Sequence, residues 1–179
     1  MKIIAISDTH IKDSIHEHLP SCLIALLRAS DMIIHAGDFV TKHVYDELSE
    51  ICMLEGVYGN MDDPYLKDAL PERKLIDIEG IRIGVVHEAA LSLHNTTGVR
   101  YMAKEMGVDI LIFGHLHRPL IEKSDVLVVC PGSPTTPTMS EPCAIELIIE
   151  DNKVLGRIKI FEGKVCSAIR TARSFMLLY

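Results

Sequence analysis

Residues 110–117 read Ile-Leu-Ile-Phe-Gly-His-Leu-His, and this stretch decides how the rest of the chain is interpreted. The apolar run at 110–113 is typical of a buried strand. The Gly-His-Leu-His segment is then the loop at the carboxyl end of that strand, which is the edge where open α/β sheets bind ligands. Two histidines one residue apart predict a metal site only if other strands bring ligands to the same edge.

The composition is that of a globular protein, with 179 residues, 48% of them hydrophobic and 24% charged. No apolar run reaches the roughly 18–20 residues of a membrane span, and residues 1–6 read as a first strand rather than a signal peptide. The formal charge of −7 disfavours an extended nucleic-acid surface, because phosphate binding normally needs a basic face. Five scattered cysteines without a Cys-x-x-Cys pair indicate reduced core residues in a cytoplasmic protein.

Apolar runs alternate with amphipathic segments, which favours an α/β fold. The pattern predicts strands over residues 2–6, 32–34, 52–58, 74–78, 81–86, 110–113, 126–129, 144–149 and 154–161. It predicts hairpin turns at 79–80 and 151–152, and a turn beginning at 63–64. Residues 162–179 have no clear pattern.

Three helices are expected between these strands. The first begins at Pro20, after a loop, and runs to about residue 30. Thr41 can cap a second helix that runs to about residue 50. The third begins at Asn95 or Thr97 and runs to residue 106, where Gly107 can close it.

Polar residues with metal-ligand chemistry recur at the ends of the predicted strands. They are Asp8, His10, Asp38, Asn60, His87, His115 and His117. Nitrogen and oxygen donors of this kind suit Mn, Fe, Co, Ni or Zn better than Ca or Mg. Seven groups are too many for one tetrahedral ion, whereas two ions that share a carboxylate can use them all. Two such ions about 3.5–4 Å apart can hold a phosphoryl group for attack.

Each of these residues also has an ordinary structural interpretation. Asp8 could cap the next helix. Asp38 and Asn60 follow glycines and could be turn residues, and His87 could be a strand-end histidine with a hydrogen-bond partner. These interpretations are weaker when taken together, because independent turn and cap residues are not expected to fit one ordered metal template.

The ordered set of motifs resembles the calcineurin-like metallophosphoesterase superfamily. The motifs are Asp8-x-His10, Gly37-Asp38, Gly59-Asn60, His87 and Gly114-His115-x-His117. The short chain and the Pro-Gly-Ser-Pro segment at 131–134 resemble its small single-domain phosphodiesterase branch. The resemblance implies a four-layer α/β/β/α sandwich with two mixed sheets, over residues 1–165. Residues 166–179 are expected to form a tail that packs on this domain or lies at a subunit interface, which would fit a homo-oligomer.

The same resemblance implies a role for each ligand. Asp8, His10 and His117 would bind one metal ion, Asn60, His87 and His115 the other, and Asp38 both. A hydroxide bridging the ions would attack the phosphorus of a small phosphodiester, with Asp38, Asn60 and His87 as catalytic residues. Manganese is the first expectation for the two divalent ions, followed by nickel, cobalt, iron or zinc.

The chain departs from the family at three places. Many members have a histidine after the asparagine that protonates the leaving group, and here Met61 stands there. Leaving-group protonation must then come from water or Asp62, or not occur, and general acid catalysis is worth about 10²–10⁴-fold. Glu88 replaces a usual glycine, so it could bind metal, repel an anionic substrate or point away. The arginine that often follows the Pro-Gly-Ser-Pro segment is missing from residues 135–138.

Other interpretations remain open from the sequence alone. His35 lies outside the template, and we expect it to be structural or to orient a ligand. The fold also serves as a protein-binding scaffold in the retromer subunit that resembles these enzymes, and the substitutions at residues 61 and 88 fit that role. A phosphomonoesterase is a third hypothesis, which the missing acid disfavours.

Overall fold

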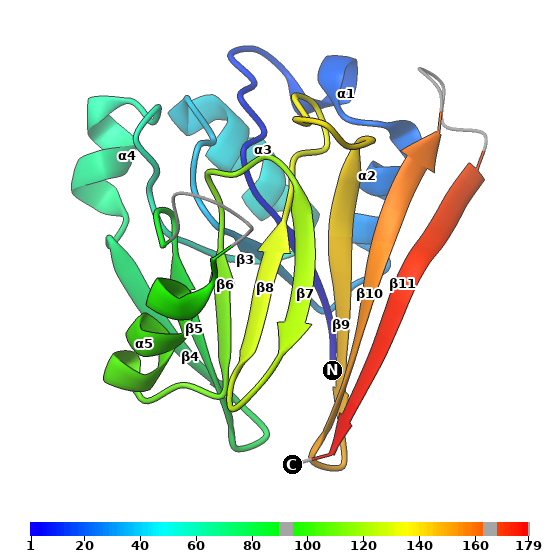
Figure 1. The fold of residues 1–179 in the computed structure, drawn as a ribbon. Helices are drawn as coiled ribbons and strands as arrows, with labels where there is room; N and C mark the ends of the chain where they lie inside the picture. Colours follow the sequence, from blue (N-terminus) through cyan, green and yellow to red (C-terminus); the bar gives the residue numbers. More distant parts are fainter. Residues whose placement is uncertain (90–94, 163–167, 179) are drawn as a thin grey trace.

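The larger of two β-sheets contains six strands in the order β11-β10-β9-β1-β2-β3 (Figure 1). The computed structural model describes residues 1–89, 95–162 and 168–178, without the side chains of 168 and 172–178. The strands of this sheet are β1 (Lys2–Ile6), β2 (Met32–His35), β3 (Met53–Gly56), β9 (Cys143–Glu150), β10 (Lys153–Glu162) and β11 (Ala168–Leu178). Strands β1, β2 and β3 are parallel, whereas β9, β10 and β11 are joined by antiparallel pairing. The sheet is therefore mixed.

The smaller sheet contains five strands in the order β4-β5-β6-β8-β7. They are β4 (Arg73–Ile78), β5 (Ile81–Val86), β6 (Ile110–Phe113), β8 (Leu127–Pro131) and β7 (Pro119–Lys123). The central strands β5, β6 and β8 are parallel, and the two edge strands pair antiparallel to them. Both sheets thus present several parallel carboxyl ends, which is where ligands bind in α/β folds.

Successive side chains along a strand point to opposite faces of the sheet and pack in separate hydrophobic cores. In β1, Ile3 and Ala5 join the core between the two sheets, while Ile4 and Ile6 face the helices of the larger sheet. The helices on that side are α1 (Ile15–His18), α2 (Ser21–Arg28), α3 (Lys42–Ile51) and α4 (Pro64–Ala69). A third core lies between the smaller sheet and α5 (Thr97–Met106). The predicted four-layer sandwich is confirmed (Figure 1).

Both predicted hairpin turns occur at the predicted residues, and their backbone angles explain why. Glu79 and Gly80 have φ of 53° and 82°, and Asp151 and Asn152 have φ of 50° and 57°. Left-handed residues at both central positions match the twist of a two-residue hairpin. Gly107, with φ of 66°, ends α5 as predicted.

Several predicted boundaries were wrong. The helix predicted to begin at Pro20 begins at Ser21, with Pro20 as its N-cap. The residues before it form the short helix α1 instead of a loop, with Ser14 as its N-cap. Asp63 caps α4 through a hydrogen bond from the Leu66 backbone N–H, so a helix begins where a turn was expected. Thr96 is the N-cap of α5, rather than Asn95 or Thr97.

Two strands were not predicted, because apolar and polar residues do not alternate regularly in their sequences. Strand β7 begins with a proline and includes two charged residues, which is tolerated because β7 is an edge strand. Strand β11 pairs along nearly the whole length of β10, in the segment expected to be a tail. The division of the chain after residue 165 stays a prediction.

The prediction that all the cysteines are reduced thiols fails at one position. Cys22 is disulfide-bonded, so the prediction was wrong there, whereas Cys52, Cys130 and Cys143 are free. Burial raises the pKa of Cys130 and of Cys143 to about 12, which keeps both thiols protonated.

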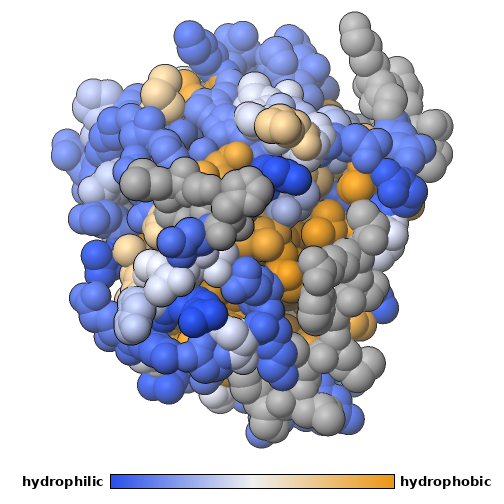
Figure 2. Space-filling view, viewed as in Figure 1, coloured by the Kyte–Doolittle hydropathy of each residue, from blue (hydrophilic) through white to orange (hydrophobic). Residues whose placement is uncertain are grey.

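In the described part of the chain, no helix is long and apolar enough to cross a membrane. The face shown in Figure 2 is largely hydrophilic, with hydrophobic surface visible between the two sheets.

Candidate metal centre

The structure brings all seven predicted ligands together above the carboxyl ends of five strands. Strand β1 leads to Asp8 and His10, β2 to Asp38, β3 to Asn60, β5 to His87, and β6 to His115 and His117. The strands come from both sheets, so the site lies across the top of the sandwich as drawn in Figure 1. Parallel strands explain this convergence, because their carboxyl ends share one edge.

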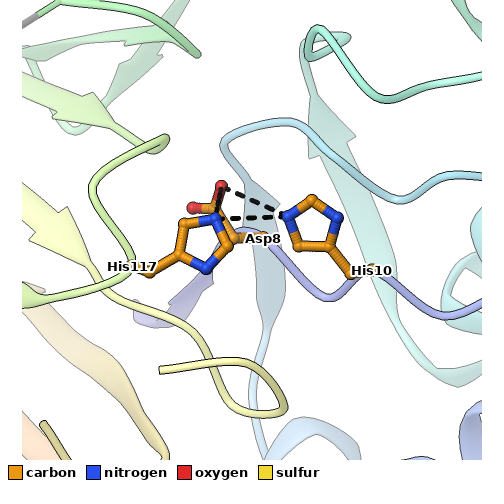
Figure 3. Close-up of side chains that lie close together, drawn as sticks. All are labelled: Asp8, His10 and His117. Atoms are coloured by element: carbon orange, nitrogen blue, oxygen red, sulfur yellow. Dashed lines mark hydrogen bonds and ion pairs between the residues drawn. The ribbon is translucent and has the colours of Figure 1, made fainter. Parts of the chain in front are cut away.

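The first group consists of Asp8, His10 and His117 (Figure 3). The Nε2 atoms of His10 and His117 are 3.2 Å apart. The Oδ1 atom of Asp8 lies 3.3 Å from His117 Nε2 and 3.9 Å from His10 Nε2. Three donor atoms therefore face one another, from residues that lie up to 109 positions apart in the sequence.

The second group consists of Asn60, His87 and His115. Asn60 Oδ1 lies 3.0 Å from His87 Nε2 and 3.3 Å from His115 Nδ1. The carboxylate of Glu88 can also join His87 and His115, with ligand atoms all within 4.8 Å of one another. The second group can thus supply two imidazoles, an amide oxygen and a carboxylate.

One oxygen of Asp38 contacts both groups. Its Oδ2 atom lies 3.4 Å from His10 Nε2 in the first group and 3.4 Å from His87 Nε2 in the second. Its Oδ1 atom accepts a hydrogen bond of 2.7 Å from the Met61 backbone N–H, which fixes the carboxylate plane. This is the geometry expected of a residue shared by two ions.

Hydrogen bonds show which histidine nitrogens face the centre as acceptors. His87 Nδ1 donates to the Ala36 carbonyl at 2.7 Å, and His117 Nδ1 donates to the Thr136 carbonyl at 2.7 Å. The Nε2 atom of each ring therefore meets Asp8, Asp38 or Asn60 oxygens with a lone pair unless it is protonated. Lone pairs that face one another at 3.0–3.4 Å repel unless a proton or a metal ion lies between them. The donor set fits divalent metal ions of the nitrogen- and oxygen-binding kind.

The backbone is left-handed at most of these positions. Positive φ values, rare outside glycine, occur at Asp8 (54°), His10 (46°), Asp38 (63°), His115 (70°) and His117 (51°). Such conformations cost free energy and persist where surrounding structure enforces them. Here the Asp8 N–H donates to the Gly37 carbonyl, the His10 N–H to the Asp38 carbonyl, and the His115 N–H to the Asp8 carboxylate.

Two glycines allow the loops to approach so closely. A Cβ atom at Gly59 would lie 2.1 Å from Asp38 Oδ1, and one at Gly114 would lie 2.1 Å from Ser7 Oγ and 2.6 Å from the Ala36 carbonyl oxygen. Any side chain at these positions would push the loops apart. The glycines before Asn60 and His115 are therefore part of the construction of the site.

Asp62 holds the loops together instead of facing the ligands. Its carboxylate accepts hydrogen bonds from the backbone N–H groups of Asp38 (3.2 Å), Val40 (2.6 Å) and Gly59 (2.7 Å). Burial raises the pKa of Asp62 although these hydrogen bonds oppose the shift. Asp62 thus positions Asp38.

His35 packs beside the site and contacts Thr9, which lies between two predicted ligands. It stacks on Phe39 with ring centroids 3.5 Å apart, and its Nε2 atom lies 3.2 Å from Thr9 Oγ1. Complete burial holds the pKa of His35 well below its usual value, so the ring is neutral. His35 therefore supports the segment between Asp8 and His10.

Charges within the site are strongly coupled. Burial raises the pKa of Asp8. Burial would also raise the pKa of Asp38, but hydrogen bonding and charge from His87 outweigh it and lower that pKa. Burial would lower the pKa of His87, and its contacts with Asp38 instead raise it. The site therefore attracts positive charge toward Asp38.

The sequence did not reveal a hydroxyl cluster beneath the first group. Ser133 Oγ donates to the Asp8 carbonyl at 2.7 Å, and Thr135 Oγ1 donates to the Thr9 carbonyl at 2.5 Å. Thr136 supplies the carbonyl that orients His117. The Pro-Gly-Ser-Pro segment indicated a turn near the ligands, and the threonines that follow it gave no comparable signal.

Comparisons with known proteins agree with this geometry. Residues 1–152 match the sequence profile of the calcineurin-like phosphoesterase superfamily domain. The chain belongs to this superfamily. A probable metallophosphoesterase of Methanothermobacter thermautotrophicus is 36% identical to this chain over 174 residues, covering 97% of this chain and 100% of that protein. A phosphodiesterase of Methanocaldococcus jannaschii is 31% identical over 144 residues, covering 74% and 83%.

A solved structure extends the likeness to the whole fold. Vacuolar protein sorting 29 of Cryptosporidium parvum superposes on this chain with a TM-score of 0.84, covering 99% of this chain and 98% of that one. Sequence identity is 22%, so the likeness concerns the fold alone.

Proposed function

We propose that this chain is a phosphodiesterase that holds two divalent metal ions, manganese first among them, and hydrolyses a small phosphodiester. The observation that carries the proposal is the position of Asp38 Oδ2, which lies 3.4 Å from a histidine of each ligand group. A relative that is 31% identical is named a phosphodiesterase.

The ligands divide into two sets around Asp38. Asp8, His10 and His117 would hold one ion, and Asn60, His87 and His115 the other. When bound, two such ions acidify water and neutralise the charge that develops on the phosphoryl oxygens. The chain itself fixes the geometry, because His87 and His117 are each anchored through Nδ1 to a backbone carbonyl.

Met61 occupies the position where many family members carry the histidine that protonates the leaving group. Met61 is 55% exposed and has no proton to donate from its side chain. Asp62 cannot take that role, because its oxygens accept backbone hydrogen bonds and it is buried. With neither residue as the acid, water would protonate the leaving group, which favours diesters with good leaving groups such as 4-nitrophenol.

The test is hydrolysis of bis(4-nitrophenyl) phosphate with added Mn²⁺. Wild type should be active, and both Asp38→Asn and His87→Ala should lose at least about hundredfold in kcat/KM. His18→Ala is the matched control, because His18 is exposed at the end of α1. Equal rates in wild type and the two site variants would refute the proposal.

Two alternatives are separated by related measurements. A faster rate on 4-nitrophenyl phosphate than on its diester would favour a phosphomonoesterase. A scaffold role would be favoured by protein purified without metal and without hydrolytic activity. The likeness to vacuolar protein sorting 29 concerns the fold, so it does not decide between an enzyme and a scaffold.

A further inference from the structure

A pocket of about 230 Å³ opens beside the second ligand group. It lies between the loop after β3, the start of β4 and the end of β5. Its walls are Tyr58, Gly59, Asn60, Glu72, Arg73, Val86, His87 and Glu88.

Two of the wall residues are also predicted ligands. Asn60 Oδ1 and His87 Nε2 are 3.0 Å apart and belong to the second group. A phosphoryl group held at the centre therefore has the pocket directly beside it. Whichever ester group points toward β4 must enter this space.

The size of the pocket fits part of a substrate. Sites for whole drug-sized ligands usually enclose roughly 300–1,000 Å³. The pocket is smaller, at about 230 Å³, so it accommodates one ester arm while the phosphoryl group stays outside on the ligands.

The polar walls have unused hydrogen-bonding capacity. Within the described residues, the carboxylates of Glu72 and Glu88 have no hydrogen bond or ion pair, and both residues are exposed. In the described part of the chain, the Arg73 guanidinium makes one exposed ion pair, to Glu105 at 3.7 Å. Two carboxylates against one guanidinium disfavour a second phosphate in the pocket and favour a group that donates hydrogen bonds.

The apolar walls favour a flat group. The half-buried Tyr58 supplies an aromatic ring, and the buried Val86 lies at the end of β5. Aromatic rings stack on other planar rings, and this stacking depends little on the identity of the ring. The two kinds of wall together fit a planar ring that carries N–H or O–H donors.

We propose that this pocket is the subsite for one ester arm of the substrate, and that the arm contains a flat, donor-bearing ring such as a nucleobase. Tyr58 stacks on the ring, and Glu72 accepts a hydrogen bond from it. The proposal rests on the phosphodiesterase proposed above, since the phosphoryl group is assigned to the neighbouring ligands.

The test compares small phosphate esters that differ only in the arm. Binding of adenosine 5′-monophosphate, ribose 5-phosphate and methyl phosphate to the Mn²⁺-loaded protein is measured by calorimetry, independently of turnover. Adenosine 5′-monophosphate should bind at least about tenfold more tightly than the other two. Tyr58→Leu and Glu72→Gln should each remove most of this advantage and leave methyl phosphate binding unchanged.

Glu50→Gln, an exposed glutamate at the end of α3, is the control and should change nothing. Equal affinities for the three esters would overturn the subsite, as would variants that weaken all three alike. Adenosine 5′-monophosphate binding that depends on Tyr58 in a protein unable to hydrolyse diesters would support the subsite and refute the proposed activity.

Discussion

The two ends of the sandwich use the same rare backbone conformation for different purposes. At the end that carries the ligands, left-handed residues include Asp8 and Asp38, whose exposed fractions are 0% and 2%. At the opposite end, Glu79, Asp151 and Asn152 are also left-handed, but all three are exposed in hairpin turns (Figure 1).

The difference lies in what holds each conformation. The hairpins are local, and short polar residues and glycine adopt such turns readily. At the ligand end, long-range contacts enforce the backbone, as when the His115 N–H donates to the Asp8 carboxylate across 107 positions of sequence. Strain supported by tertiary contacts marks the end where buried donor atoms must converge.

The largest expected effect is a loss of hydrolysis at one of two aspartates that have nearly the same backbone conformation. Asp38→Asn should reduce hydrolysis of bis(4-nitrophenyl) phosphate by about 10²–10³-fold, because the shared carboxylate charge is lost. Asp151→Asn makes the same chemical change in an exposed hairpin and should stay within about twofold. A similar loss in both variants would mean that Asp38 has no special role.

A second comparison concerns two glycines. Gly114→Ala should destabilise the protein by about 3 kcal/mol, since the added methyl group meets Ser7 Oγ and the Ala36 carbonyl. Gly80→Ala should cost about 1–2 kcal/mol, because nothing lies within 4 Å and only the φ of 82° is unfavourable. Urea unfolding measures both, and a Gly80→Ala variant as unstable as Gly114→Ala would contradict the packing argument.

Much of this contrast could be predicted from the sequence. Apolar runs ending in Asp, Asn or His located every strand end of the site, because buried parallel strands are continuous hydrophobic runs. The hairpin turns were predictable from their turn residues. Both inferences use features within a few residues of one another.

Contacts between distant segments could not be predicted in this way. The Asp38 and Val40 backbone groups that bind Asp62, and the hydroxyls of Ser133 and Thr135, have partners far away in the sequence. Strand β11 depends on pairing with β10 rather than on its own pattern. The pocket beside Tyr58 is formed by three separate loops and strands, so its shape follows only from the assembled fold.

A smaller effect is expected at Glu88. Its carboxylate can join His87 and His115, so Glu88→Gln should weaken binding of one ion by about tenfold and leave the other unchanged. Glu79→Gln, in the hairpin at the opposite end, is the control. Calorimetric titration with Mn²⁺ distinguishes the two, and an unchanged isotherm for Glu88→Gln would show that Glu88 points away.

The smallest effect concerns a buried carboxylate that lies between the two ends. Burial would raise the pKa of Glu146, but hydrogen bonds from Lys159 and Arg157, 3.1 Å away, outweigh it and lower that pKa. A lowered pKa stabilises the folded state above the unfolded value of about 4.3 and loses that contribution at more acid pH. Glu146→Gln should therefore flatten the fall in stability below about pH 4.3, as measured by thermal unfolding. An unchanged acid profile would contradict this assignment.

The most direct measurement of the central proposal is a metal count. Protein dialysed against Mn²⁺ and analysed by mass spectrometry should contain two ions per chain, because Asp38 contacts both ligand groups. His115→Ala and His117→Ala should each retain one ion, and the double variant should retain none. A single ion in wild type, or equal loss of both ions in the two single variants, would contradict a centre divided across Asp38.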